Sequence, residues 1–166
     1  MRCSVCGAEH KVVDLEPSFS RPDEVVALPA ELRAQRVKED DDLCSMSGVD
    51  SPDRYFVRCV LPVPLLDVGR SFNWGLWAEV GRAAFERVVE LWRDPNQALE
   101  PAMAATVANQ VPLSPDTRGL AVQMHLISPT ARASLRVGSD DAHPFSVECR
   151  QGVTVHRLLE WLEAMK

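Results

Sequence analysis

Two alternating stretches joined by a turn constrain the fold of this chain more than any other feature. Between residues 55 and 61, every second side chain is apolar or aromatic, and one face of an extended strand is formed by Tyr55, Val57, Cys59 and Leu61. Pro62 and Pro64 then end that strand or confine it to a sheet edge, and Gly69 begins a turn into residues 72–78. The pattern predicts a β-hairpin.

The second arm of this hairpin carries two of the chain's four tryptophans. Phe72, Trp74 and Leu76 alternate on one side of the strand. Trp77 lies with Gly75 on the other side, so we expect both faces to be covered near the end of the strand. Because glycine has no side chain, this position also leaves space over the backbone for an aromatic ring or a ligand. A packed core explains the same residues, since aromatic side chains bury large areas in any fold.

Helical periodicity and proline boundaries predict four helices. In residues 81–93, one face has apolar side chains at positions i, i+3, i+4 and i+7, which are Phe85, Val88, Val89 and Trp92. Pro29 begins a short helix over residues 29–38, and prolines at both ends bound an alanine-rich helix over residues 101–110. Thr154 caps a closing helix, whose buried stripe is Val155, Leu158, Leu159 and Leu162.

Three more strands are predicted by short alternating segments over residues 120–127, 133–137 and 145–149. In this scheme Cys149 lies in a strand interior, as Cys59 does. The order of strands and helices does not alternate as it does in a parallel βαβ fold. We therefore expect an α+β fold with a mostly antiparallel sheet, helices on one face of it, and an N-terminal segment that resembles a zinc knuckle.

Composition and charge narrow the class of protein. The 166 residues are 46% hydrophobic, which is enough for one core, so we expect a single domain with an N-terminal knuckle and wrapping segment (1–54) and an α+β core (55–166). A net charge of -6 argues against nucleic-acid binding, which rests on clustered Lys and Arg. No apolar run approaches the roughly 20 residues of a membrane span, and the first residues do not resemble a signal peptide. We expect a cytoplasmic protein without a membrane or nucleic-acid partner.

The cysteines supply the one candidate metal site. Cys3 and Cys6 form a Cys-x-x-Cys pair whose tight turn lets two thiolates approach one ion, and tetrahedral Zn²⁺ takes four ligands. Cys44 is a plausible third ligand and His10 a fourth, so the sequence predicts a structural zinc site of Cys3, Cys6, His10 and Cys44. Reduced cysteines on a surface turn are the alternative. A thioredoxin-like role is disfavoured, because the sequence after the pair does not predict the helix that lowers a thiol pKa.

The other polar residues give no catalytic signature. His125 and His143 are candidate general bases, with Asp116 as the nearest carboxylate, although an isolated histidine is weak support for catalysis. An acidic run over residues 39–42 either assists a hard cation or keeps a loop hydrated. We assign no catalytic residue.

Motifs spread over nearly the whole chain carry a family resemblance. They are Cys3-Ser4-Val5-Cys6-Gly7 with Glu9-His10, Asp42-Leu43-Cys44, Phe56-Val57-Arg58, Pro64, Phe72 with Trp74-Gly75 and Trp77, Phe85, Leu91-Trp92, Pro115-Asp116-Thr117, Val122 with His125, His143-Pro144 and Gly152. With these motifs the chain resembles a bacterial family catalogued as domain of unknown function 2199. The resemblance implies a single-domain cytoplasmic protein and a common role for the four candidate zinc ligands. It implies no established activity.

Three functional hypotheses follow. The leading one is a non-enzymatic, zinc-stabilised interaction or regulatory module that binds another protein, with the strand of Trp74 and Trp77 as an exposed contact surface. The second is a small hydrolase or ligand-binding enzyme in which His125, His143 and Asp116 converge on a cleft. The third is a toxin-neutralising protein, whose acidic charge suits a basic target.

Overall fold

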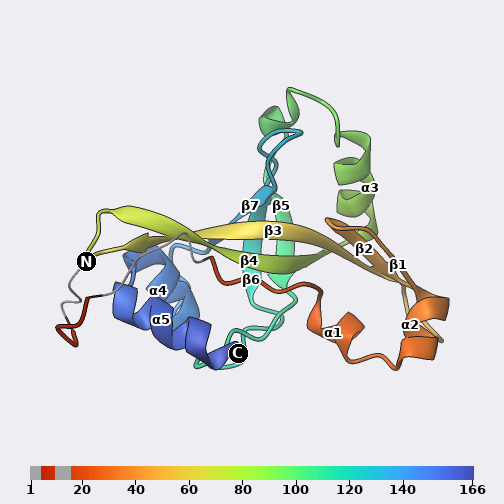
Figure 1. The fold of residues 1–166 in the computed structure, drawn as a ribbon. Coiled ribbons are helices and arrows are strands. Elements are labelled where there is room, and N and C mark those ends of the chain that lie inside the picture. The colour runs from red at the N-terminus through yellow and green to blue at the C-terminus, as the bar shows by residue number, and fades with distance from the viewer. Residues whose placement is uncertain (1–4, 10–15) are drawn as a thin grey trace.

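A long β-hairpin runs through the whole molecule, as the alternation predicts. The computed structural model describes residues 5–9 and 16–166. In it, strands β3 (Arg54–Leu65) and β4 (Arg70–Val80) pair antiparallel from Tyr55 opposite Val80 to Leu65 opposite Arg70. Figure 1 shows this hairpin spanning the molecule from end to end.

Pro62 and Pro64 lie inside β3 and do not end it. The backbone nitrogen of Arg58 points away from β4 and donates to the Asp42 carbonyl oxygen at 2.8 Å. The two-residue period of a strand places the nitrogens of Pro62 and Pro64 on that same edge, beyond the last pairing with β7 at Val60 and before the bridge of Leu65 to Val153. No ladder hydrogen bond is lost there, which confirms the expectation that these prolines occupy a sheet edge.

Five strands close into a small barrel. Strands β5 (Met103–Val107), β6 (Ala121–His125) and β7 (Ala133–Val137) continue from β4 with antiparallel pairing, and β7 then pairs with β3. This last contact is parallel, because the first and fifth strands of an up-and-down series point the same way. The sheet is therefore mostly antiparallel, as expected, but it is a barrel and has no single open face.

Strands β1 (Val37–Glu39) and β2 (Leu43–Met46) extend this sheet along β3. The edge of β3 that faces away from β4 therefore pairs with two strands. Strand β2 pairs with this edge as far as Val57, and β7 pairs with it from Cys59. Arg58 stands at the junction.

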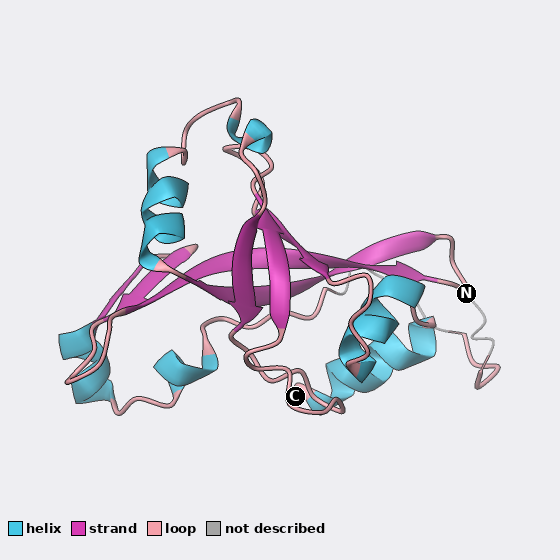
Figure 2. Ribbon diagram, turned by 180° about the vertical axis from the view of Figure 1, so that it is seen from behind, coloured by secondary structure: helices cyan, strands magenta, loops and turns pink. Residues whose placement is uncertain are grey.

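The helices lie on different sides of the hairpin, so the expectation of one helical face is wrong. They are α1 (Asp23–Val26), α2 (Ala30–Arg36), α3 (Arg82–Glu90), the 3-10 helix η1 (Gln97–Leu99), α4 (Pro144–Gln151) and α5 (Val155–Ala164). Figures 1 and 2 show α4 and α5 below one end of the hairpin and α1 and α2 at the other end. Helix α3 projects from the opposite side, together with η1 and the β6–β7 loop.

Two predicted elements have the wrong type. The expected helix over residues 101–110 is strand β5, in which Ala105 and Val107 are buried at a two-residue interval. The expected strand over residues 145–149 is helix α4, in which Phe145 and Cys149 are buried at a four-residue interval. Both segments are short apolar runs, for which either period fits, so the neighbouring elements decide the outcome.

The two tryptophans of β4 are both fully buried, in different clusters on opposite faces of the strand. Trp74 packs against Trp161 of α5, with ring centroids 5.3 Å apart, in the main core. Trp77 packs in a second cluster with Val25, Cys44, Met46, Phe56 and Ala108. The prediction that both faces of this strand are covered is confirmed.

The space over Gly75 is occupied by the chain's own N-terminal segment. Gly75 N donates to Pro17 O at 2.8 Å, and Phe19 N donates to Gly75 O at 2.9 Å. A Cβ atom at Gly75 would lie 2.5 Å from Cβ of Ser18. Residues 17–19 therefore fill the position that the sequence left open for an aromatic ring or a ligand.

A buried asparagine joins the loop after β5 to the hairpin. Asn109 is fully buried; its Oδ1 accepts from Trp77 N at 2.8 Å and its Nδ2 donates to Arg21 O at 2.9 Å. Thr117, also fully buried, donates to Asn109 O at 2.6 Å. This network gives the Pro115-Asp116-Thr117 motif a structural role, because every buried polar group in it needs a partner.

Candidate ligand pocket

A pocket of about 480 Å³ opens at the junction on the edge of β3. Residue Asp42 directly precedes β2, and Arg132 directly precedes β7. Both strands start beside Arg58, so the topology brings three charged residues from distant parts of the sequence together. We call the part of the pocket formed by Asp42, Arg58 and Arg132 the notch. A volume of this size lies in the range of small-ligand sites, roughly 300 to 1,000 Å³.

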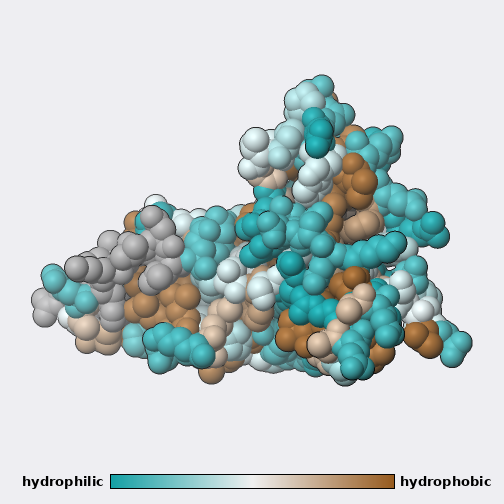
Figure 3. Space-filling view, turned by 45° about the vertical axis from the view of Figure 1, so that its right-hand side comes forward, coloured by the Kyte–Doolittle hydropathy of each residue, from teal (hydrophilic) through white to brown (hydrophobic). Residues whose placement is uncertain are grey.

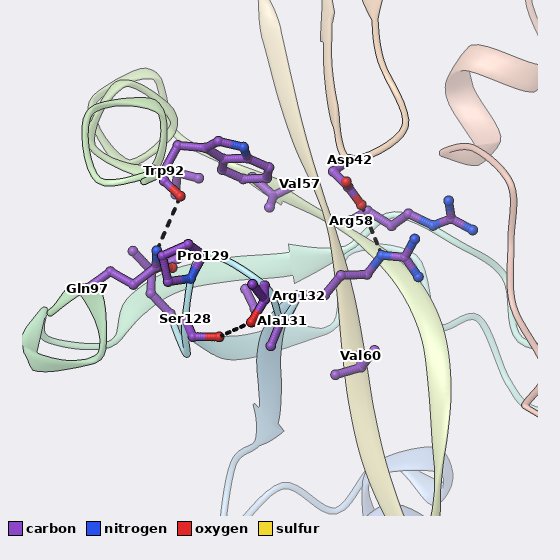
Figure 4. A pocket seen from close by; sticks show the side chains of 14 residues that line it. Asp42, Val57, Arg58, Val60, Trp92, Gln97, Ser128, Pro129, Ala131 and Arg132 are labelled. Atoms are coloured by element: carbon purple, nitrogen blue, oxygen red, sulfur yellow. Dashed lines mark hydrogen bonds and ion pairs between the residues drawn. The ribbon is translucent and has the colours of Figure 1, made fainter. Parts of the chain in front are cut away.

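The rest of the pocket is mostly apolar. Besides these three residues its lining consists of Val57, Val60, Val88, Trp92, Gln97, Leu126, Ser128, Pro129, Thr130, Ala131 and Ala133. Figure 4 shows Trp92 and Gln97 on one side, and the side chains of Arg58 and Arg132 running in the same direction away from them. One end of the pocket is thus charged, and the other end is bounded by an indole ring.

Arg58 is the unusual group of this site. Its Nε is buried without a hydrogen-bond partner, and its Nη1 makes one long contact, 3.3 Å, to the carbonyl oxygen of Asp41. Burial, followed by the neighbouring positive charge of Arg132, lowers the pKa of the Arg58 guanidinium. The group stays charged, because arginine is not deprotonated in proteins, and the carboxylates of Asp42 and Asp41 offset these two effects only in part.

Arg132 already holds one carboxylate. Its Nε lies 2.9 Å from Oδ1 of Asp42, and both side chains are partly exposed, at 42% and 32%. The pair ties the start of β7 to the start of β2. Its exposure makes it a weak contributor to stability, about 0 to 1 kcal/mol.

Trp92 is the exposed tryptophan of the chain. It is 40% exposed, whereas Trp74, Trp77 and Trp161 are fully buried. Its position is set by the end of α3, where buried Gln97 donates through Nε2 to the carbonyl oxygens of Leu91, Trp92 and Asp94 at 3.1, 3.4 and 3.2 Å. The Leu91 and Asp94 carbonyl oxygens also accept from the backbone nitrogens of Asp94 and Gln97, so the Gln97 side chain adds to the hydrogen bonds that hold the end of α3.

Apolar side chains are also exposed around this end of the molecule. Val89, Leu99 and Ile127 are 50%, 83% and 43% exposed. They belong to α3, η1 and the segment after β6, which form the projection described above. Figure 3 shows apolar surface gathered on this projection.

The predicted zinc ligands do not assemble in the described part of the chain. Cys3 and His10 lie outside the described residues. The segment of residues 5–9, which contains Cys6, and strand β2, which contains Cys44, lie at opposite ends of the hairpin (Figures 1 and 2). Among residues 5–9 and 16–166, no three His, Cys, Asp or Glu side chains could hold a metal ion together. The zinc site stays a prediction.

Cys44 itself is a buried core residue. It is 1% exposed, and burial raises the pKa of its thiol to about 11. Metal binding requires the thiolate, which this environment disfavours. Cys59 and Cys149 are buried as expected, although Cys149 lies in a helix and not in a strand.

The candidate general bases and Asp116 do not form a catalytic group. His143 caps α4 by accepting from Phe145 N through Nδ1, at 3.1 Å, and its Nε2 contacts the backbone oxygen of Asp116 at 3.0 Å. The Asp116 carboxylate instead pairs with Arg118 at 3.2 Å, and that hydrogen bond holds the pKa of the carboxyl below its ordinary value. His125 lies on β6 opposite Ser134 of β7. The imidazole of His143 therefore meets a peptide carbonyl where a catalytic pair needs a carboxylate.

The acidic run over residues 39–42 forms the β1–β2 turn. Asp40 Oδ1 accepts from the backbone nitrogens of Asp42 and Leu43, both at 2.8 Å, and Glu39 pairs with Arg33 and Arg21, each at 2.8 Å. The run thus lies in a turn, which agrees with the expectation that it forms a loop. Its last residue, Asp42, enters the pocket.

Burial excludes the strand of Trp74 and Trp77 as the contact surface of the leading hypothesis. Trp74 and Trp77 are both 0% exposed, so the strand that carries them offers no aromatic patch to a partner.

The pocket was not predicted. Asp42, Arg58 and Trp92 nevertheless stand in the Asp-Leu-Cys, Phe-Val-Arg and Leu-Trp motifs that carry the family resemblance.

Comparisons with known proteins identify a family but no activity. A family model described as an uncharacterised protein conserved in bacteria, DUF2199, matches residues 2–153. No curated protein and no solved structure gives a significant match. In the described part of the chain, no helix has the length and apolarity to cross a membrane.

Proposed function

Because the chain belongs to the uncharacterised bacterial family DUF2199, we propose its function from the pocket: it is a non-enzymatic binding module that captures an anionic ligand beside Arg58. The observation that carries the proposal is the buried Arg58 Nε without an acceptor, in a pocket that also contains Arg132. This function keeps the binding role expected from the sequence and moves it from the two-tryptophan strand to the notch.

Arg58 Nε is a charged donor without an acceptor. A buried polar group without a hydrogen bond costs roughly 1 to 3 kcal/mol, and more when it is charged. Two guanidinium groups in one notch repel each other, and burial followed by the charge of Arg132 lowers the pKa of Arg58. An anion placed between them supplies the missing acceptor and offsets this repulsion, so the arrangement favours an occupied site.

The test uses Trp92 as an internal reporter. We expect at least one of three aromatic anions, phenylacetate, phenyl phosphate or benzenesulfonate, to change the fluorescence of the protein saturably, while neutral phenylacetamide does not. Arg58→Gln should weaken that binding at least tenfold. The matched control is Arg136→Gln, which removes an exposed arginine of β7 that does not line the pocket.

Two results would refute the proposal. One is the absence of binding by all three anions to a protein shown to be folded by circular dichroism. The other is equal affinity of the wild type and a folded Arg58→Gln variant.

A further inference from the structure

We propose that the anion is a carboxylate carried on an apolar body, such as an aromatic or aliphatic acid or the C-terminal residue of a polypeptide. This inference rests on the proposed function and names its ligand class. Three features of the notch carry it: the local balance of charge, the way Arg132 already binds Asp42, and the apolar lining that leads from the arginines to Trp92.

The charge around Arg58 fits one negative charge better than two. Arg132 is paired with Asp42, and the nearby Arg21 is paired with Glu39 at 2.8 Å. Arg58 receives from Asp41 only a backbone carbonyl, not the carboxylate. One positive charge is therefore left without an ion-pair partner. A phosphate dianion would bring a second negative charge close to Asp42, whereas a carboxylate balances Arg58 alone.

The existing ion pair shows which anion the notch already accommodates. Arg132 donates its Nε to a carboxylate oxygen of Asp42 at 2.9 Å, and Arg58 has its own Nε free of partners beside it. A second carboxylate between the guanidinium groups would accept from Arg58 Nε after a shift of the Arg58 side chain, because this atom is buried. It would also compete with Asp42 for Arg132. Asp42 thus acts as a competitor that lowers the affinity of the site.

The apolar body of the ligand has a defined place. Val57, Val88 and Leu126 form part of the lining, and Trp92 and Pro129 bound the side of the pocket away from the arginines (Figure 4). A group attached to the bound carboxylate extends over this apolar surface. An indole face favours a ring or a branched aliphatic chain there through offset or edge contacts.

A matched set of ligands tests this inference. We expect N-acetylphenylalanine to bind the wild-type protein, with affinity at least tenfold higher than that of its neutral amide and of phenyl phosphate. Acetate, which lacks the apolar body, should bind at least tenfold more weakly than N-acetylphenylalanine. Arg58→Gln should remove most of the affinity for N-acetylphenylalanine.

Two further variants separate the roles of the neighbouring charges. Asp42→Asn should raise the affinity for N-acetylphenylalanine severalfold, because it frees Arg132. Arg136→Gln should leave the affinity unchanged. Loss of affinity in a folded Asp42→Asn variant would overturn the competitor role that we assign to Asp42.

Peptide titrations show whether the carboxylate belongs to a small acid or to the C-terminus of a polypeptide. A hexapeptide ending in phenylalanine is titrated with a free and with an amidated C-terminus. Tighter binding of the free-acid peptide than of N-acetylphenylalanine identifies a polypeptide C-terminus as the source, and equal binding identifies a small acid.

The outcome also separates this inference from the proposed function. Binding of phenyl phosphate in preference to N-acetylphenylalanine overturns the carboxylate assignment and leaves the anion-binding module intact. Absence of binding by both overturns the carboxylate assignment, and the proposed function falls with it when phenylacetate and benzenesulfonate also fail to bind.

Discussion

Gly75→Ala should destabilise the protein strongly, although it adds one methyl group. The added Cβ would lie 2.5 Å from Cβ and 3.1 Å from Cα of Ser18, and these atoms belong to a backbone segment that cannot rotate away. The segment 17–19 must therefore move off β4. Gly75 itself lies in a strand with ordinary φ, so backbone strain does not contribute.

The magnitude follows from the contacts that such a movement breaks. The two backbone hydrogen bonds of Gly75, to Pro17 and from Phe19, are worth about 1 kcal/mol each. Trp77 Nε1 donates to Phe19 O at 3.3 Å, a bond that the movement also weakens, and overpacking costs about 1 to 3 kcal/mol. We expect a total loss of about 3 to 5 kcal/mol in the free energy of unfolding.

The assay is equilibrium unfolding in urea, followed by tryptophan fluorescence. Gly138→Ala is the matched control, because its Cβ would meet only ordinary contacts at 3.6 Å or more, and we expect a change within about 0.5 kcal/mol. Ser18→Gly removes the atom nearest the clash, so the double variant Ser18→Gly with Gly75→Ala should regain at least about 1 kcal/mol relative to Gly75→Ala. A Gly75→Ala variant within about 0.5 kcal/mol of the wild type, or no recovery in the double variant, would show that the contact of Gly75 with Ser18 does not limit stability.

Three further predictions concern buried polar groups and cysteines. Asn109→Ala should cost about 2 to 4 kcal/mol in urea unfolding, because it leaves Trp77 N without its acceptor in a fully buried place; a loss below about 1 kcal/mol would contradict this. Since burial raises the thiol pKa of Cys44 to about 11, its contribution to stability is fully present below the unfolded thiol pKa, about 8.5, and is lost as the pH rises through 11. Unfolding at pH 7 to 11 should show this decline, and a folded Cys44→Ala variant should show a smaller one; equal slopes would count against it. The zinc prediction is tested by elemental analysis of untagged protein: we expect the metal content to be unchanged in Cys44→Ala, because β2 and residues 5–9 lie far apart, and a loss of metal in that variant would instead support the four-ligand set.

The hairpin could be predicted because its signal is local and strong. Alternation over residues 55–61 and 72–78 specifies strands with buried faces, and the structure has both. The sequence left open whether Pro62 and Pro64 end the strand or lie at a sheet edge, because it does not show which edge of β3 their nitrogens face. The predictions for residues 101–110 and 145–149 were wrong for a related reason. Each short segment fits both the period of a strand and that of a helix, and packing against the barrel or against Trp161 selects one of them.

The pocket could not be predicted, because no local pattern marks it. Arg58 occupies a position in β3 that is typical of an exposed strand residue, and Arg132 and Trp92 are distant in sequence. They meet because β3 changes partner from β2 to β7 at Arg58, a consequence of barrel closure. Closure depends on long-range pairing, whereas sequence patterns report local periodicity.

The most direct test of ligand binding at Arg58 observes the Nε–H group of this residue by NMR. Its cross-peak is assigned by its absence from the spectrum of Arg58→Gln, and the wild-type protein is titrated with N-acetylphenylalanine. We expect a saturable shift of the Arg58 Nε–H signal with little change at Arg136, because the ligand carboxylate becomes the acceptor that Arg58 lacks. An Arg58 signal that does not move while the ligand is bound would show that the carboxylate binds elsewhere.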